Sequence, residues 1–199
     1  MKFASLCALG LVSMLAVPAL AQEDGRNGGD QEAEMMKKWM EVATPGEHHK
    51  FYDYFVGSWT TECKMWMAPG EPSITQGKAE YKWIFGNRYL VEDYEGIFMG
   101  QPFTGQSIGG YDNTKHMYTG FWIDSMSTSM MMMEGTLDQT GKVLSAFGTM
   151  NEWTTGEHDK TFKTVTRIVD PDTFVFEMHD LHIVPGETKV MEITYKRKK

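Results

Sequence analysis

The chain has 199 residues, with 19 basic and 27 acidic side chains and a formal net charge of −8. An acidic surface repels phosphate backbones, so nucleic acid is not expected as a partner. The length suits a single domain, and a hydrophobic content of 41% is enough for a sizeable core.

The N-terminus has the pattern of a cleavable export signal. Lys2 precedes an apolar run through Val17, and the small-residue exit Ala19-Leu20-Ala21 predicts cleavage after Ala21. We therefore expect residues 1–21 to be a signal peptide and the protein to be secreted or periplasmic. The run is short for a bilayer span of about 20 residues, and no later run approaches that length. No membrane span is expected in the mature chain, and an uncleaved anchor helix is the alternative.

Two short helices are predicted ahead of the sheet. Residues 22–31 are polar and glycine-rich and are expected to form a flexible leader, followed by one domain over residues 32–199. The first helix has its apolar residues on one stripe: Met35, Met36, Trp39, Met40 and Ala43. The second is predicted from the capping box Thr44-Pro45-Gly46-Glu47 to Gly57.

After Gly57 the apolar period changes from 3.6 to 2, which is typical of strands with one wet face. Turn residues such as Asp112-Asn113 and Pro185-Gly186 separate ten such segments. The expected strands are Trp59 to Met67, Gly77 to Phe85, Arg88 to Glu95, Gln101 to Tyr111, His116 to Asp124, Thr128 to Leu137, Val143 to Trp153, Lys160 to Val169, Thr173 to His182 and Lys189 to Arg197.

Ten strands in hairpin order leave two exposed edges unless the last strand pairs with the first. We therefore predict an all-β fold, a ten-stranded antiparallel up-and-down barrel of the calycin or lipocalin-like kind, with a two-sheet sandwich as the alternative. Ten strands leave an interior cavity unless the helices fill it. Cys63 is the one cysteine beyond the export signal, and we expect it to be buried; a reactive or dimer-bridging thiol is the alternative.

The chain also resembles a known family over roughly His48 to Arg197. The resemblance is carried by several short stretches: Gly57-Ser58-Trp59, Phe85-Gly86-Asn87-Arg88-Tyr89-Leu90, Gly96 to Phe103, Gly110-Tyr111-Asp112-Asn113, Trp122-Ile123-Asp124-Ser125, Glu134 to Asp138 and Ile193 to Arg197. Together they are similar to the domain-of-unknown-function family numbered 1579. The resemblance implies a lipocalin-like barrel, often in exported bacterial proteins, without established activity or catalytic residues. Asn87 departs from the glycine expected there, and the long methionine run is a second departure.

Aromatic and polar side chains near the open strands are candidates to line a cavity. The predicted ligand-binding residues are Trp59, Tyr81, Trp83, Tyr89, Trp122, Met130, Met132 and Arg167. Because Phe121 and Trp122 face opposite ways, one of them must lie outside the barrel, where we expect it to pack under the helices or at a dimer contact.

The chain is rich in methionine, with 17 in all and four in succession from Met130 to Met133. Thioethers bind Cu(I), but they also fill irregular cores and line adaptable apolar pockets, and the second interpretation is favoured. The six histidines lack the spacing of a metal site, so no metal and no cofactor is expected.

Support for catalysis is lacking, because the sequence has no nucleophile elbow, phosphate-binding loop or zinc helix motif. Asp124, or Glu92 with Asp93, would serve as acid or base only if buried. The favoured interpretation is that Asp124 closes a turn and that Glu92 and Asp93 sit at a wet strand end.

These observations predict an exported, non-enzymatic binding module that holds a small apolar or amphipathic molecule in a barrel cavity. Two other functions are kept open: a structural or partner-binding envelope protein, and a metal or haem carrier that uses methionine and histidine side chains. A homodimer is also left open.

Overall fold

The computed structural model describes residues 26–152, 155–181 and 188–199. The predicted signal peptide lies outside these residues. The chain divides into two compact units, Met1–Trp39 and Met40–Lys199, and the second contains all the strands. Among the described residues, no helix combines the length and the apolar character needed to cross a membrane.

The N-terminal elements are the α-helix α1, Arg26–Ala43, and the 3-10 helix η1, Glu47–Tyr54. The prediction of a flexible leader over 22–31 is wrong for residues 26–31, which belong to α1. Extending a helix that has already nucleated adds one hydrogen bond for each residue fixed, so polar residues can join its start.

The predicted capping box at Thr44 is also wrong. Gly46 is the N-cap of η1, and its backbone N–H donates to His49 Nδ1 at 3.0 Å. The Thr44 hydroxyl instead donates to the Met40 carbonyl at 2.6 Å, which satisfies one of the free carbonyls at the end of α1.

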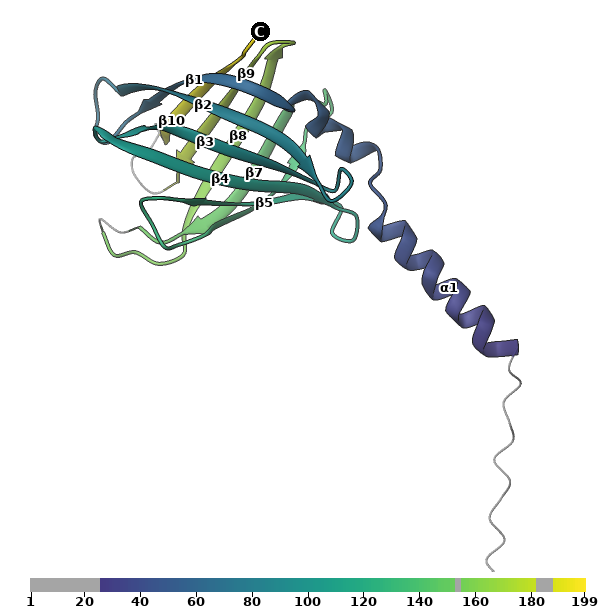
Figure 1. Cartoon of the computed structure of the whole chain (residues 1–199). Helices are drawn as coiled ribbons and strands as arrows, with labels where there is room; N and C mark the ends of the chain where they lie inside the picture. The colour runs from purple at the N-terminus through teal and green to yellow at the C-terminus, as the bar shows by residue number, and fades with distance from the viewer. Residues whose placement is uncertain (1–25, 153–154, 182–187) are drawn as a thin grey trace, which may run out of the picture. The chain divides into compact units, whose positions relative to one another are not determined.

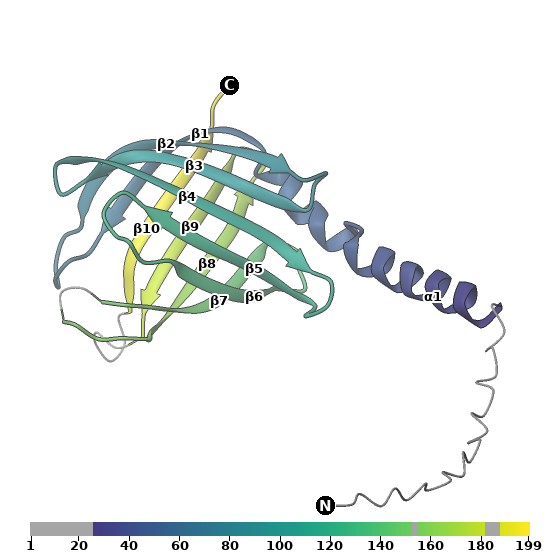
Figure 2. The ribbon, with the colours of Figure 1, turned by 60° about the horizontal axis from the view of Figure 1, so that its bottom comes forward.

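Ten antiparallel strands close into a barrel, as Figures 1 and 2 show, and this confirms the predicted fold class. Each strand pairs with its neighbour in sequence, and β10 closes the ring by pairing with β1 from Trp59↔Arg197 to Met65↔Met191. The strands are β1 Gly57–Met65, β2 Ser73–Ile84, β3 Tyr89–Phe98, β4 Gln101–Asp112, β5 Met117–Asp124, β6 Met131–Leu137, β7 Val143–Met150, β8 Lys160–Asp170, β9 Thr173–Asp180 and β10 Lys189–Arg197.

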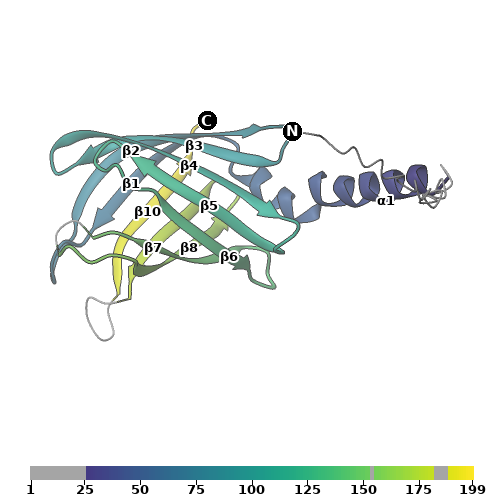
Figure 3. The same cartoon turned by 90° about the horizontal axis from the view of Figure 1, so that it is seen from below.

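The two ends of the barrel differ. We call the end where η1 leads into β1 the helix end. The opposite end, where β1, β3, β5, β7 and β9 finish, we call the loop end; the hairpin turn from β5 to β6 lies there (Figure 3).

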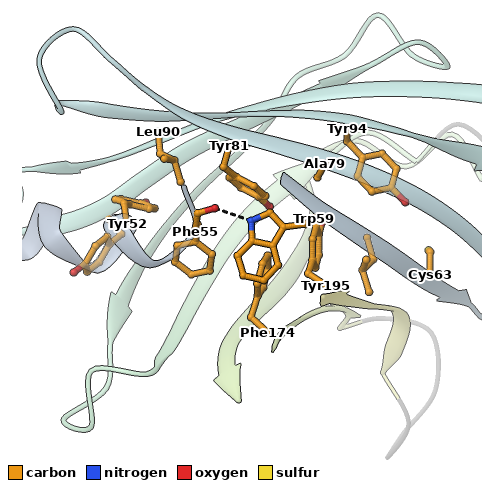
Figure 4. Close-up of a cluster of buried hydrophobic side chains, with 12 residues drawn as sticks. Tyr52, Phe55, Trp59, Cys63, Ala79, Tyr81, Leu90, Tyr94, Phe174 and Tyr195 are labelled. Atoms are coloured by element: carbon orange, nitrogen blue, oxygen red, sulfur yellow. Dashed lines mark hydrogen bonds between the residues drawn. The ribbon is translucent and has the colours of Figure 1, made fainter. Parts of the chain in front are cut away.

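Aromatic side chains pack the helix end solidly. Figure 4 shows Phe55, the C-cap of η1, beside Trp59 of β1, whose indole N–H donates to the Phe55 carbonyl at 2.7 Å. The Phe174 ring stacks on Tyr195 at 4.1 Å between centroids and meets Trp59 edge-on at 4.8 Å. Trp59 keeps only 1% of its surface exposed, so η1 and these rings fill this half of the interior.

Candidate functional site

The interior of the barrel at the loop end is lined differently from the helix end. Alternate residues of a strand face inward, and near the loop end many of these side chains are large and apolar. Several of them are half-buried: Met65, Phe103, Trp122, Met131, Met133, Met150, Phe176 and Met191, whereas Tyr94, Phe162 and Met178 are buried. Inward-facing residues at the helix end, such as Trp59, Leu90, Tyr118 and Phe174, are buried. These loop-end side chains therefore keep some accessible surface, and we call the part of the interior that they line the accessible half.

Trp122 is the largest side chain of this accessible half. Its ring lies parallel to Phe103, with 6.2 Å between centroids, and its indole N–H donates to Asp124 Oδ2 at 2.9 Å. It lies against Gly105 on the neighbouring strand, where any added Cβ would overlap the indole ring. Gly105 is thus what allows Trp122 to lie flat on the barrel wall.

The methionine run divides between the two faces of β6. Met131 and Met133 face inward, and the Thr164 hydroxyl, itself inside the barrel, lies 3.9 Å from Met133 Sδ. Met132 faces outward and is 65% exposed, and Met130, just before the strand, is 63% exposed. Half of the run is therefore available to an interior ligand.

A buried carboxyl group forms the floor of the accessible half. Glu92 accepts hydrogen bonds from the Tyr195 hydroxyl at 3.0 Å, from the Ser107 hydroxyl at 3.1 Å and from the Tyr81 hydroxyl. Burial raises the pKa of Glu92 above its ordinary value, although these three donors act in the opposite direction. Ser107 is half-buried, so it is the member of this network nearest to the accessible space.

A second polar group faces inward at the loop end. Lys160 Nζ lies 2.5 Å from Asp180 Oδ2, and the two side chains keep only 6% and 2% of their surface exposed. Glu152 lies 3.7 Å from the same Nζ. Nearby, the chain segments after β5 and β7 bound a shallow hollow of 230 Å³, lined among others by Met126, Ser129, Asn151 and His158.

The structure places the eight predicted ligand-binding residues in three environments. Trp122 alone among them lies in the accessible half. Trp59 and Tyr81 face inward but are buried in the packed aromatic cluster, and Trp83 packs edge-on against Tyr52 at the helix end. The remaining four, Tyr89, Met130, Met132 and Arg167, do not line the interior.

Each of these four placements has a simple cause. Tyr89 is 44% exposed because its neighbour Leu90 takes the inward position on β3. Arg167 faces outward with Glu177, 3.9 Å away on β9, because Ile168 packs on the core. The methionines Met130 and Met132 fall on the wrong side of the alternation that Met131 and Met133 define. The predicted role of all four residues as cavity lining is therefore wrong.

Of the two expectations for acidic residues, the one for Asp124 is confirmed and the one for Glu92 is wrong. Asp124 closes a turn, since its Oδ1 accepts from the backbone N–H groups of Met126 and Ser127 at 2.9 and 3.1 Å, as predicted. Glu92 is not at a wet strand end but is 7% exposed, whereas its neighbour Asp93 bonds Lys82 and Gln106 on the outer side. Within the part of the chain that is described, no three His, Cys, Asp or Glu residues gather as metal ligands would.

The outward partner of Trp122 is Phe121. It lies on the outer face of β5 between Ile108 of β4 and Met132 of β6, which are its register partners. One of the two aromatic residues thus lies outside the barrel, as predicted; the contact that would cover it stays a prediction.

Comparisons with known proteins agree with this architecture. The crystal structure of Rv2717c from M. tuberculosis is similar, with a TM-score of 0.59 and 12% identity, over 78% of this chain and 100% of that chain. The S-type phycobiliprotein lyase CPES from Guillardia theta is similar with a TM-score of 0.51 and 12% identity, over 80% of this chain and 96% of that one. At such identity the likeness shows the lipocalin-like fold. No curated protein matches the chain. The family model described as "Protein of unknown function (DUF1579)" matches residues 44–197, and the chain belongs to that family.

Proposed function

We propose that the protein is a binding module that holds a small apolar or amphipathic molecule in the loop-end half of its barrel. The observation that carries the proposal is the contrast between the two halves of the interior. At the helix end Trp59, Leu90, Tyr118 and Phe174 are buried, whereas at the loop end Phe103, Trp122, Met131 and Met133 keep accessible surface. Apolar surface left open inside a barrel favours an apolar guest.

The chemistry of the lining suits a guest of variable shape. Methionine side chains have three rotatable bonds and a polarisable sulfur, so they adapt to different apolar surfaces. The Phe103 and Trp122 rings supply flat, rigid contact area, and Trp122 lies beside Met131 on the neighbouring strand. Ser107, above Glu92, offers one hydroxyl to a polar end of the guest, which is why the proposed class includes amphipathic molecules.

The proposed place of action is outside the cytoplasm, in the periplasm or the medium, and rests on the export signal in residues 1–21. Molecules with an apolar body are poorly soluble in such an aqueous space. A barrel with an open apolar half would carry or sequester them there.

The proposal is tested by titrating the mature chain with the apolar dye 1-anilinonaphthalene-8-sulfonate and following dye fluorescence. Met131→Trp adds bulk inside the barrel, and Met132→Trp is its matched control, one residue along the strand on the outer face. We expect saturable binding to the wild type, at least tenfold weaker binding to M131W, and an unchanged Kd for M132W.

Equal effects of M131W and M132W, or dye binding that never saturates, would contradict an interior site. Circular dichroism and Tm show whether M131W is folded. Met131→Ala provides a second interior variant that does not crowd the core, and we expect it to bind a bulkier dye more tightly than the wild type does.

A further inference from the structure

Three of the interior methionines lie side by side across neighbouring strands. Met65 of β1 is the register partner of Met191 of β10, and Met191 is the register partner of Met178 of β9. All three face inward, because they continue the alternation of Cys63, Ile193 and Phe176, which are residues of the core. Met178 is 8% exposed, and Met65 and Met191 are half-buried.

A β-bulge produces this row. The register of β10 against β9 shifts between Lys189↔His179 and Met191↔Met178, so two residues of β10 oppose one of β9. Lys189 is thereby directed outward, where its Nζ contacts Glu177 and Glu192, while Met191 faces inward. In a regular strand Lys189 and Met191 would share one face, and a lysine would lie beside the methionines.

The spacing allows three sulfur atoms to converge. Side chains directly opposite on an antiparallel pair have Cβ atoms about 5 Å apart, and the outer two of three strands are about 10 Å apart. A methionine has three rotatable bonds beyond its Cα, so Met65 and Met178 can both lean toward Met191.

We propose that Met65, Met178 and Met191 form a thioether site for a soft monovalent cation, Cu(I) being the expected one. Soft thioether ligands select Cu(I) over the hard divalent ions, which prefer oxygen. Three neutral ligands add no negative charge, so in apolar surroundings they suit a single positive charge better than a double one.

The surroundings of the row agree with a neutral ligand set. Cys63 lies one layer deeper on β1, opposite Ile193, and is buried. The charged groups directly beside the row, Lys64, Glu177 and Glu192, lie on the outer face of the same strands and pair with one another or with Lys189. The inward-facing Asp180, two residues after Met178, is paired with Lys160. The site therefore goes beyond the proposed carriage of apolar molecules: it uses the opposite wall of the interior from Trp122 and Met131, which lie on β5 and β6.

The test uses Ag(I), a soft monovalent probe that does not change oxidation state, on the mature chain labelled with ¹³C at the methionine methyl groups. Single Met→Leu variants assign the signals, since leucine and methionine have similar volumes. We expect the first equivalent of Ag(I) to shift the Met65, Met178 and Met191 methyl signals together. Met191→Leu should weaken Ag(I) binding at least 100-fold, whereas the exposed control Met132→Leu should leave it unchanged.

Earlier shifts of the exposed methionines, or unchanged Ag(I) affinity in M191L, would overturn the site. Since the methyl spectrum is recorded on the wild type, the result does not depend on the variant folding. Dye binding to M191L separates the two proposals: we expect it to remain, because the dye site and the thioether row are on different walls. Cu(I) held by a competing chelator under anaerobic conditions then checks the cation itself, and it should be taken up by the wild type and M132L but not by M191L.

Discussion

Replacing the buried Glu92 carboxyl group should destabilise the barrel, by an amount that depends on the residue that replaces it. Glu92 is 7% exposed and accepts from the hydroxyls of Tyr81, Tyr195 and Ser107. Each buried donor that loses its partner costs about 1–3 kcal/mol. The Tyr81 and Tyr195 hydroxyls also form a hydrogen bond with each other, so not all three donor hydroxyls lose every partner. We therefore expect Glu92→Leu to lower the free energy of unfolding by at least about 3 kcal/mol.

Glu92→Gln keeps the shape and one acceptor oxygen, and its effect should vary with pH. Burial raises the pKa of Glu92 in the folded state above the ordinary value of 4.5, so the folded protein holds this proton more tightly than the unfolded chain does. That stabilisation is fully present below pH 4.5 and is lost as the pH rises through the folded-state pKa. The loss amounts to about 1.4 kcal/mol for each tenfold difference in proton affinity.

Urea unfolding at pH 4, 5.5 and 7 measures both effects, with fluorescence and circular dichroism as independent probes. The destabilisation caused by E92Q should be largest at pH 4, where the wild type is protonated, and should shrink or reverse at pH 7. A destabilisation by E92Q that grows with pH would refute a raised pKa for Glu92. An E92L variant as stable as the wild type would refute the buried network.

Two further predictions concern the same half of the barrel. Lys160→Met removes one partner of a buried ion pair and leaves the Asp180 carboxylate inside, so it should lower the free energy of unfolding in urea by about 3–5 kcal/mol. The control Lys78→Met, at an exposed pair, should lower it by less than about 1 kcal/mol. Equal losses in the two variants would show that burial of the pair does not matter. Gly105→Val should displace the Trp122 indole, lowering Tm and altering the near-ultraviolet circular dichroism, and an unchanged spectrum would contradict the packing of that ring on the glycine.

Much of the fold could be predicted from local pattern. The β4–β5 turn illustrates why: Asp112 accepts from the backbone N–H groups of Thr114 and Lys115 at 2.7 and 3.0 Å, which is the turn chemistry that an Asp-Asn pair indicates. Period-two alternation then placed Trp59 and Tyr81 on an inward face, and both are there. An even number of hairpin-connected strands allows the last strand to pair antiparallel with the first, and closure removes both exposed edges.

Which inward positions are accessible could not be predicted from the sequence. The packing of η1 into the helix end depends on a contact between Phe55 and Phe174, which are far apart in the sequence and have 4.9 Å between ring centroids. No local sequence pattern indicates that contact. In the methionine run every residue is alike, so register alone decides that Met131 rather than Met132 faces inward.

The burial of Glu92 was not predicted, for a similar reason. Its neighbour Asp93 is equally acidic, and only the positions of Tyr195 and Ser107 on other strands reveal which of the two is buried. The hydroxyl-bearing residues on the inward faces of β2, β4 and β10 indicate a buried acceptor, but they are recognised as neighbours only once the pairing of the strands is known.

An open, apolar loop-end half of the interior is tested most directly by a spin-labelled fatty acid, 16-doxyl-stearate, added to the protein with ¹³C-labelled methionine methyl groups. The nitroxide broadens the signals of nuclei close to it, so it reports where the chain of the fatty acid lies. We predict that the signals of Met131 and Met133 broaden at low equivalents while those of Met130 and Met132, their exposed neighbours, stay sharp. Broadening of Met130 and Met132 first, or of none of the four, would contradict an interior that receives an apolar guest.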